Sequence, residues 1–333
     1  MSETMSETMS EKIVVTNRIH PEVLARLEQV GRVVVNPLLE PWSQQALTEH
    51  LSDATALMGF MTDCVDTTLL QQAPKLKIVA CALKGFDNYD ISACTTRNVW
   101  VSIVPDLLTE PTAELAVGLG ISLGRHVLQG DHLMRTTHFK GWRAQLFGIG
   151  LHNSVVAILG LGMVGQAIAQ RLSGFGCKSV LGVDPFKKIT GVTSCELAEA
   201  LSTADYVFVA IPLTPESINM LSHEQLALCK PGQLMINVGR GSVVNEQAVA
   251  DALEQGRLAG YAADVFACED WGLNGRPQEI EPRLLAHPRT VFTPHLGSAV
   301  ASVRLAIEQK AADNIIAALK GQTPPDAINS MGE

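Results

Sequence analysis

The sequence predicts an α/β protein with two parallel-sheet domains, and three observations support this fold class. The chain has 333 residues, which exceeds the size of one ordinary domain. Short β-branched runs alternate with longer helical stretches, as in parallel sheets covered by helices. Apolar residues make up 47% of the chain and charged residues only 18%, a composition that supplies two full cores.

The first group of expected strands follows a polar N-terminal repeat. Residues 1–11 contain no apolar signal core, and we expect them to form a disordered tail. A helix is expected over Pro21–Val30, because proline suits the first position of a helix. Five strands are expected in this group: Lys12–Arg18, Arg32–Asn36, Ala54–Met61, Leu76–Leu83 and Val99–Val104.

A long apolar helix over Thr109–Arg125 is expected to connect two groups of strands. It is too apolar to lie exposed, so we also expect it to form the interface of a homodimer. A last helix, Ala301–Lys320, is followed by Gly321, a residue type common after helix ends. The second group of strands comprises Ser154–Gly160, Ser179–Asp184, Tyr206–Pro212, Leu234–Val238, Gly260–Phe266 and Thr290–Pro294.

The late helix implies that the second group of strands is inserted into a split first domain. We expect the first domain over residues 12–107 and 302–333, and the second over residues 108–301. Both are expected to be Rossmann-like or flavodoxin-like, with parallel sheets.

Composition excludes several classes of partner. The net charge of −9 argues against a nucleic-acid surface, and no apolar run reaches membrane-spanning length. The seven cysteines form no C-x-x-C pair, which favours reduced thiols and a cytoplasmic location. The nine histidines show no metal-ligand spacing, so no metal is expected. A small anion remains compatible if its site is locally cationic.

A dinucleotide-binding motif opens the second domain. Gly160, Gly162 and Gly165 form G-L-G-M-V-G between the apolar strand SVVAIL and the helix MVGQAIAQRL. The three glycines allow a tight turn, close approach of the backbone to a pyrophosphate and close packing of helix on strand. The helix N-terminus then offers N–H groups to phosphate. The flanking strand and helix argue against the alternative, a glycine-rich turn without a ligand.

Asp184 ends the next expected strand, about 20 residues after the motif. Its carboxylate can accept hydrogen bonds from ribose hydroxyls and would repel a 2′-phosphate, so NAD is the expected cofactor. Lys187 and Lys188 leave contact with a phosphate open. The second domain is therefore expected to be an NAD-binding Rossmann domain, and the first to be the substrate-binding (catalytic) domain.

Three polar residues are expected near the carboxyl ends of strands in the second domain, where parallel sheets bind ligands. Arg240 follows LMINVG, Glu269 comes shortly after GYAADVF, and His295 ends TVFTPH. A histidine can exchange a proton near neutral pH, and a carboxylate can orient its ring. The planar fork of an arginine matches two oxygens of an oxyanion. We expect Glu269 to pair with His295, with Asp270 as the alternative carboxylate.

These motifs resemble the D-2-hydroxyacid dehydrogenase family in order and spacing. G-L-G-M-V-G, N-V-G-R-G-S-V-V-N-E, G-Y-A-A-D-V-F and T-P-H-L-G-S-A carry the resemblance, which covers nearly the whole chain after the tail. It implies NAD as the cofactor and catalysis by Arg240, Glu269 and His295. It also implies that the cofactor is contacted by Gly160, Gly162, Met163, Val164, Gly165, Asp184, Pro212, Val238 and Asp264.

The expected substrate residues include one departure from ordinary members of this family. Lys84 stands where those members usually carry a small residue, and the surrounding CALKGFDNYD resembles members that oxidise phosphite. The resemblance therefore implies oxidation of phosphite to phosphate with reduction of NAD. Lys84 would add a positive charge for this dianion from the other domain. By the same resemblance, the substrate pocket is lined by Met61, Gly85 and Arg304, and Trp142 borders it.

Two other functions stay open. In a D-2-hydroxyacid dehydrogenase or 2-oxoacid reductase, Arg240 would hold the substrate carboxylate and His295 would exchange the hydroxyl proton. Lys84 argues against this alternative, because its extra positive charge suits the dianion phosphite. The second alternative is an NAD(H)-sensing binding protein on the same scaffold. Phe147 also departs from the resemblance, which places tyrosine there.

Overall fold

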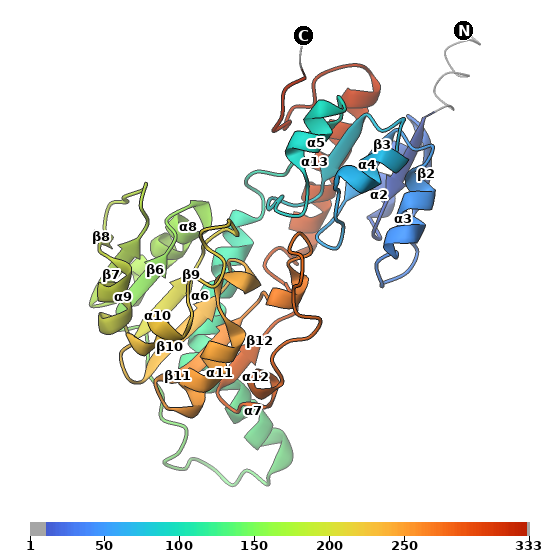
Figure 1. The fold of residues 1–333 in the computed structure, drawn as a ribbon. Coiled ribbons are helices and arrows are strands. Elements are labelled where there is room, and N and C mark those ends of the chain that lie inside the picture. The colour runs from blue at the N-terminus through green and yellow to red at the C-terminus, as the bar shows by residue number, and fades with distance from the viewer. Residues whose placement is uncertain (1–10, 332–333) are drawn as a thin grey trace, which may run out of the picture. The chain divides into compact units, whose positions relative to one another are not determined.

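The computed structural model describes residues 11–331, which form two compact units (Figure 1). Unit 2 comprises Thr109–Asp270 and Gly275–Ala299, and unit 1 comprises the described residues before and after it. The short segment Trp271–Asn274 also belongs to unit 1, which the sequence did not indicate. Gly272 explains this, because a Cβ there would lie 2.5 Å from the carbonyl oxygen of Asp87.

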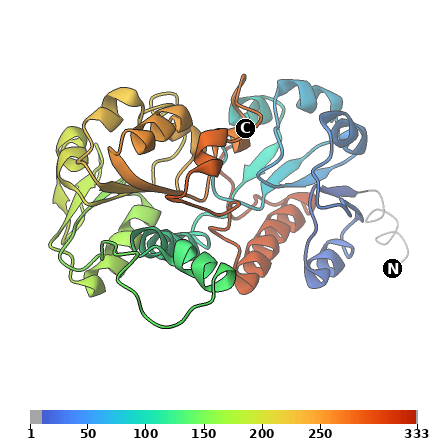
Figure 2. The same cartoon turned by 90° about the horizontal axis from the view of Figure 1, so that it is seen from below.

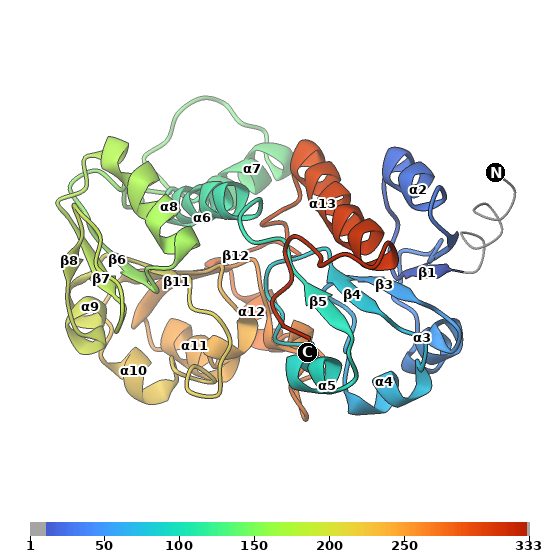
Figure 3. The ribbon, with the colours of Figure 1, turned by 90° about the horizontal axis from the view of Figure 1, so that it is seen from above.

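Unit 1 contains a five-stranded parallel sheet in the order β2-β1-β3-β4-β5. Helices α2 and α13 cover one face, and α3, α4 and α5 cover the other (Figure 3). The strands are β1 (Lys12–Val15), β2 (Arg32–Val35), β3 (Ala56–Gly59), β4 (Ile78–Cys81) and β5 (Trp100–Ser102). The helices are α2 (Pro21–Leu27), α3 (Gln44–Leu51), α4 (Thr67–Gln72), α5 (Ile91–Thr96) and α13 (Ala301–Leu319).

Unit 2 contains a seven-stranded sheet, also parallel, in the order β12-β11-β10-β9-β6-β7-β8. The strands are β6 (Val155–Leu159), β7 (Ser179–Val183), β8 (Thr193–Ser194), β9 (Tyr206–Val209), β10 (Gln233–Asn237), β11 (Leu258–Ala263) and β12 (Thr290–Phe292). Two parallel sheets covered by helices confirm the expected fold class.

The helices of unit 2 lie on both faces of this sheet (Figure 3). Helices α6 and α8 share one apolar core with the sheet, and α9, α10, α11 and α12 share another. The α-helices are α6 (Thr109–Gly124), α7 (Val127–Thr136), α8 (Met163–Leu172), α9 (Leu197–Thr203), α10 (His223–Ala227), α11 (Glu246–Glu254) and α12 (Pro282–Ala286). The 3-10 helices are η1 (Ser173–Phe175), η2 (Gly241–Val243) and η3 (Ala267–Glu269).

The buried side chains of helix α6, including Ala116, Leu119 and Leu123, lie in a core of unit 2 itself, which accounts for its apolar character without a second copy. The expected part of this helix in a dimer interface stays a prediction. No residue of α7 is buried, however, and Figure 2 shows the loop after it bowing away from the helices. We call Val127–Ile149 the apolar arm, because it exposes Val127, Leu128, Met134, Phe139, Trp142, Leu146, Phe147 and Ile149.

The expected disordered tail lies almost wholly outside the described residues. Only Glu11 is described: its carbonyl accepts the N–H of Arg32 at 2.9 Å, and its carboxylate pairs with Lys77 at 2.6 Å. Glu11 therefore belongs to the folded unit. Within residues 11–331, no helix is long and apolar enough to cross a membrane. The same residues contain no cluster of three His, Cys, Asp or Glu that could hold a metal ion.

Candidate active site

Three neighbouring parallel strands of unit 2 end at one edge of the sheet and present the expected acid–base residues there. Arg240 follows β10, Glu269 ends η3 after β11, and His295 follows β12. All three residues are partly buried. The parallel order β10-β11-β12 thus gathers residues that are far apart in the sequence.

Glu269 and His295 are in direct contact. Oε2 of Glu269 lies 2.7 Å from Nδ1 of His295, and each side chain is 29% exposed. An ionised carboxylate only accepts hydrogen bonds, so the proton of the neutral ring lies on Nδ1, and this N–H donates a hydrogen bond to Glu269. Nε2 is then left with its lone pair and is the nitrogen able to accept a proton.

The loop that carries His295 is held by Asp264. His295 adopts a left-handed backbone conformation with φ 55°, and its N–H donates to the carbonyl oxygen of Asp264 at 2.9 Å. The carboxylate of Asp264 accepts bonds from Thr293 Oγ1 (2.6 Å), Leu296 N (2.6 Å) and Gly297 N (2.8 Å). Burial raises the pKa of Asp264, against the effect of these donors. The carboxylate of Asp264 thus bonds this loop, and its expected contact with the cofactor stays a prediction.

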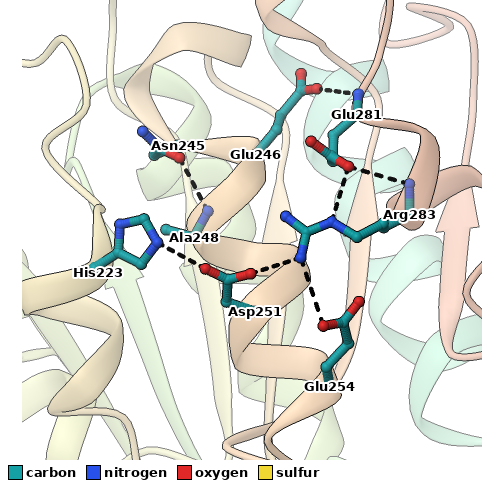
Figure 4. A network of polar contacts seen from close by, with 8 residues as sticks. All are labelled: His223, Asn245, Glu246, Ala248, Asp251, Glu254, Glu281 and Arg283. Carbon is teal, nitrogen blue, oxygen red and sulfur yellow. Dashed lines mark hydrogen bonds and ion pairs between the residues drawn. The ribbon is translucent and has the colours of Figure 1, made fainter.

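Glu246, which the sequence did not single out, holds the segment that carries Glu269. Its Oε1 accepts the N–H of Ala267 in η3 at 2.9 Å, and its Oε2 accepts the N–H of Glu281 at 2.9 Å (Figure 4). Glu269 also bonds its own turn, because its Oε1 accepts the N–H of Phe266 at 3.0 Å. The Asn-Glu pair that ends the Arg240 motif was the available signal.

The loop of Arg240 packs tightly against the η3 segment. A Cβ at Gly241 would lie 1.9 Å from the carbonyl carbon of Phe266, so only glycine allows this approach. Asp270 is buried, and its Oδ2 accepts the N–H of Ser242 at 2.7 Å. Asp270 therefore supports the Arg240 loop, and Glu269 is the carboxylate that contacts His295.

The glycine turn after β6 fits a dinucleotide pyrophosphate. Gly160 has φ 91°, and a Cβ there would lie 2.7 Å from the carbonyl oxygen of Ala210. A Cβ at Gly165 would meet the carbonyl oxygen of Gly160 at 2.0 Å. Gly162, by contrast, faces open space among the described residues and begins α8 without a side-chain cap. The first turn of α8 thus has N–H groups for an anion.

Asp184 lies at the end of β7 beside this turn. Its Oδ2 accepts the N–H of Leu161 at 2.8 Å, and its Oδ1 accepts those of Phe186 and Lys187, each at 2.9 Å. Burial opposes ionisation, but these donors outweigh it and lower the pKa of Asp184. The carboxylate is therefore anionic at neutral pH. The other expected cofactor residues belong to segments that follow β6, β9 and β10: Met163, Val164, Pro212 and Val238.

The expected substrate residues of unit 1 lie after the carboxyl ends of its central strands. Met61 follows β3, Lys84 and Gly85 follow β4, and all three are partly buried. Arg304, in the first turn of α13, lies 5.8 Å from the centroid of the Phe60 ring. Burial lowers the pKa of Arg304, and the carboxylate of Glu308 opposes this shift.

Comparison with known proteins identifies the class of this site. Residues 117–297 match the family model described as D-isomer specific 2-hydroxyacid dehydrogenase, NAD binding domain. A glyoxylate reductase of Pyrococcus furiosus is 33% identical over 330 residues, which cover 96% of both chains. The structure resembles a protein from Thermus thermophilus with TM-score 0.88 and 31% identity, covering 96% of this chain and 100% of that one.

A further structural relative is an NADPH-dependent glyoxylate/hydroxypyruvate reductase of Sinorhizobium meliloti, in complex with NADP and malonate. It has TM-score 0.83 and 28% identity, and the match covers 96% of this chain and 97% of that one. These comparisons establish an NAD-binding domain. By name, the relatives fit the open alternative of 2-oxoacid reduction better than the expected oxidation of phosphite.

Proposed function

Because the chain belongs to the D-isomer specific 2-hydroxyacid dehydrogenase family, we propose that it is an NAD-dependent dehydrogenase that oxidises phosphite to phosphate. The observation that carries the reaction class is the contact of 2.7 Å between Glu269 and His295. The choice of substrate rests on Lys84, which carries the resemblance to members of the family that oxidise phosphite.

In this proposal each residue of unit 2 has one role. The glycine turn and Asp184 would hold NAD, which would supply the acceptor for the hydride of the P–H bond that breaks. Nε2 of His295 takes a proton from the water whose oxygen forms the new P–O bond. Glu269 keeps the proton on Nδ1 and stabilises the ring once it is charged. Arg240 binds two oxygens of the anion and stabilises the negative charge that develops on them.

Charge favours phosphite over a 2-oxoacid. Phosphite is largely a dianion near neutral pH, whereas glyoxylate carries a single negative charge. In a protein with a net charge of −9, a small anion needs local cations, and unit 1 offers Lys84 after β4 and Arg304 in the first turn of α13. The ammonium group of Lys84 and the guanidinium group of Arg304 give unit 1 two positive charges, which suit the more highly charged substrate.

The second candidate is reduction of a small 2-oxoacid such as glyoxylate, and the names of the relatives favour it. In that reaction His295 gives its proton to the carbonyl oxygen, and Arg240 holds the carboxylate. The same residues thus serve both reactions, and the substrate decides between them.

One assay distinguishes the two candidates. NADH formation is followed by absorbance with phosphite and with a panel of D-2-hydroxyacids, and NADH consumption is followed with glyoxylate. We expect the kcat/KM for phosphite to exceed the others by at least about tenfold, which corresponds to about 1.4 kcal/mol. Turnover of glyoxylate without turnover of phosphite would refute the substrate and retain the reaction class.

A matched pair of variants tests the role of Lys84. Lys84→Ala should raise the KM for phosphite by at least about tenfold, the scale of one charge-assisted hydrogen bond, and leave the KM for NAD unchanged. Lys75→Ala removes the same charge from an exposed position of unit 1 and should change neither constant. Equal phosphite constants in the two variants would show that Lys84 does not bind the substrate.

We also propose that the protein is a homodimer that uses the apolar arm. Eight apolar side chains of the arm are exposed on a single chain. The arm is nevertheless anchored at both ends, because Gln129 donates to the carbonyl of Pro288 at 2.5 Å and Tyr206 donates to that of Ile149 at 2.6 Å. An apolar segment held in this way is typical of a surface that a second copy covers.

A further inference from the structure

The turn Phe60–Asp63 of unit 1 is closed by a buried carboxylate. Asp63 is 5% exposed, and its backbone N–H donates to the carbonyl oxygen of Phe60 at 3.1 Å. Its Oδ2 accepts the N–H of Phe60 at 2.6 Å and the hydroxyl of Thr16 at 2.5 Å. Thr16 follows β1, so Asp63 ties this turn to the neighbouring strand of the sheet.

The same turn is bonded to the segment that follows β4. The side-chain amide of Asn88 donates to the carbonyl oxygens of Met61, at 3.3 Å, and of Asp63. The hydroxyl of Tyr89 donates to the carbonyl oxygen of Phe60 at 2.8 Å. The turn that carries Met61 and the segment that carries Lys84 are therefore one hydrogen-bonded assembly.

The turn also supports Arg304. The Phe60 ring lies 5.8 Å from the guanidinium carbon of Arg304, a cation–π distance. The backbone N–H of Phe60 donates the hydrogen bond to the carboxylate of Asp63 that closes the turn. A shift of this turn would thus move a candidate substrate residue, Met61, and the aromatic support of another, Arg304.

We propose that Asp63 is a positioning residue, whose carboxylate fixes the turn Phe60–Asp63 and thereby sets Met61 and Arg304 for the substrate anion. This inference rests on the proposed function, and it holds for phosphite and for glyoxylate alike. Asp63 does not touch the substrate in this account. It acts through the backbone of its own turn.

The hold on the turn depends on the charge of Asp63. Burial raises the pKa of Asp63 to about 6, against the effect of its bonds from Thr16 and Phe60. Burial, together with the charge of Asp63, raises the pKa values of three neighbouring groups: Cys64 in the same segment, Cys81 of β4 and Tyr89. A protonated carboxyl is a weaker acceptor, so the turn loosens as the pH falls through about 6.

The test compares the wild type with Asp63→Asn, because an amide resembles the protonated carboxyl. We expect the KM for the substrate to rise about tenfold near pH 7.5, the scale of one charge-assisted hydrogen bond, while the KM for NAD stays unchanged. The ratio of kcat/KM between the two enzymes cancels the titration of the substrate and of His295. This ratio should fall towards one near pH 5.

Two further variants make the result specific. Thr16→Val removes one donor to the carboxylate, so it should raise the pKa of Asp63 and move the acid limb of kcat/KM to higher pH. This variant keeps the test available if Asp63→Asn folds poorly. Asp66→Asn changes the same charge at the exposed N-cap of α4 and should match the wild type at every pH.

Each outcome bears on a separate claim. If the wild type turns over a substrate but its kcat/KM ratio to Asp63→Asn stays constant with pH, the positioning role is refuted. The role is likewise refuted if Thr16→Val leaves the acid limb in place. If the wild type turns over neither phosphite nor glyoxylate, the proposed function fails first, and this inference falls with it.

Discussion

Replacement of Asp63 by asparagine should stabilise the protein at neutral pH although it impairs catalysis. Burial raises the pKa of Asp63 from an ordinary 3.8 to about 6, a shift of about two units. Each unit corresponds to about 1.4 kcal/mol, so keeping this carboxylate ionised in the folded state costs about 3 kcal/mol. Asp63→Asn avoids this cost and should unfold with a free energy higher by about that amount.

The sign of the pH dependence follows from the same shift. Between about pH 4 and pH 6, the folded protein keeps a proton on Asp63 that the unfolded chain has lost. The free energy of unfolding therefore falls as the pH rises through this window, and this contribution is constant above it. Near pH 7.5, Asp63→Asn should therefore exceed the wild type in free energy of unfolding by the whole of this amount. Near pH 4 the difference should vanish.

Urea unfolding of the wild type and the variant at both pH values, followed by circular dichroism, measures this difference. Asp66→Asn serves as the control, because Asp66 is exposed and its replacement should show no such dependence on pH. The prediction is refuted if Asp63→Asn is less stable than the wild type at pH 7.5, or if the difference in free energy of unfolding between the two proteins is the same at both pH values. Lower stability of the variant at pH 7.5 would mean that the bonds from Thr16 and Phe60 outweigh the cost of burial.

Three other predictions concern the cofactor, the base and the dimer. His295→Asn should lower kcat by at least about 10²-fold, the usual contribution of a general base, with NAD binding by fluorescence near normal; more than a tenth of wild-type kcat would exclude this role. The wild type should have a higher kcat/KM with NAD than with NADP, because Asp184 repels the 2′-phosphate. Asp184→Ala should bring the two values closer by lowering the KM for NADP. Equal values of kcat/KM with the two cofactors in the wild type would contradict this. Light scattering should give a dimer mass for the wild type and a monomer mass for the double variant Trp142→Ser, Phe147→Ser, whereas a monomeric wild type would refute the dimer.

Much of the fold was predictable, because parallel strands in a doubly wound sheet are read from β-branched runs and from the turns between them. The strands are shorter than expected at their ends: the run that begins at Lys12 leaves the sheet after Val15, where the chain turns towards α2. Helix α6 lies where it was expected, and its part in a dimer interface stays a prediction. An apolar helix is equally compatible with an oligomer interface and with burial on its own sheet, and only the packing distinguishes them.

The candidate site was predictable where a residue type stands at a strand end. Arg240, Glu269 and His295 were found in this way. The supporting roles of Asp264 and Glu246 were harder to predict, because these carboxylates accept backbone N–H groups, which every residue type except proline has. For Glu246 the available signal was the Asn-Glu pair at the end of the Arg240 motif. Asp63 was missed for a further reason: a single aspartate between two expected strands gives no sign that it is buried.

Glu269, His295 and Arg240 belong to unit 2, whereas the other candidate substrate residues, Met61, Lys84, Gly85 and Arg304, belong to unit 1, which has cores of its own. A change of side chain after β3 or β4 alters unit 1 and leaves unchanged the bonds by which Asp264 holds the loop of His295. Evolution can therefore exchange the molecule that is oxidised while the proton-transfer apparatus is inherited intact. A directed-evolution library confined to Met61, Lys84 and Gly85 would search new substrates at little risk to the chemistry.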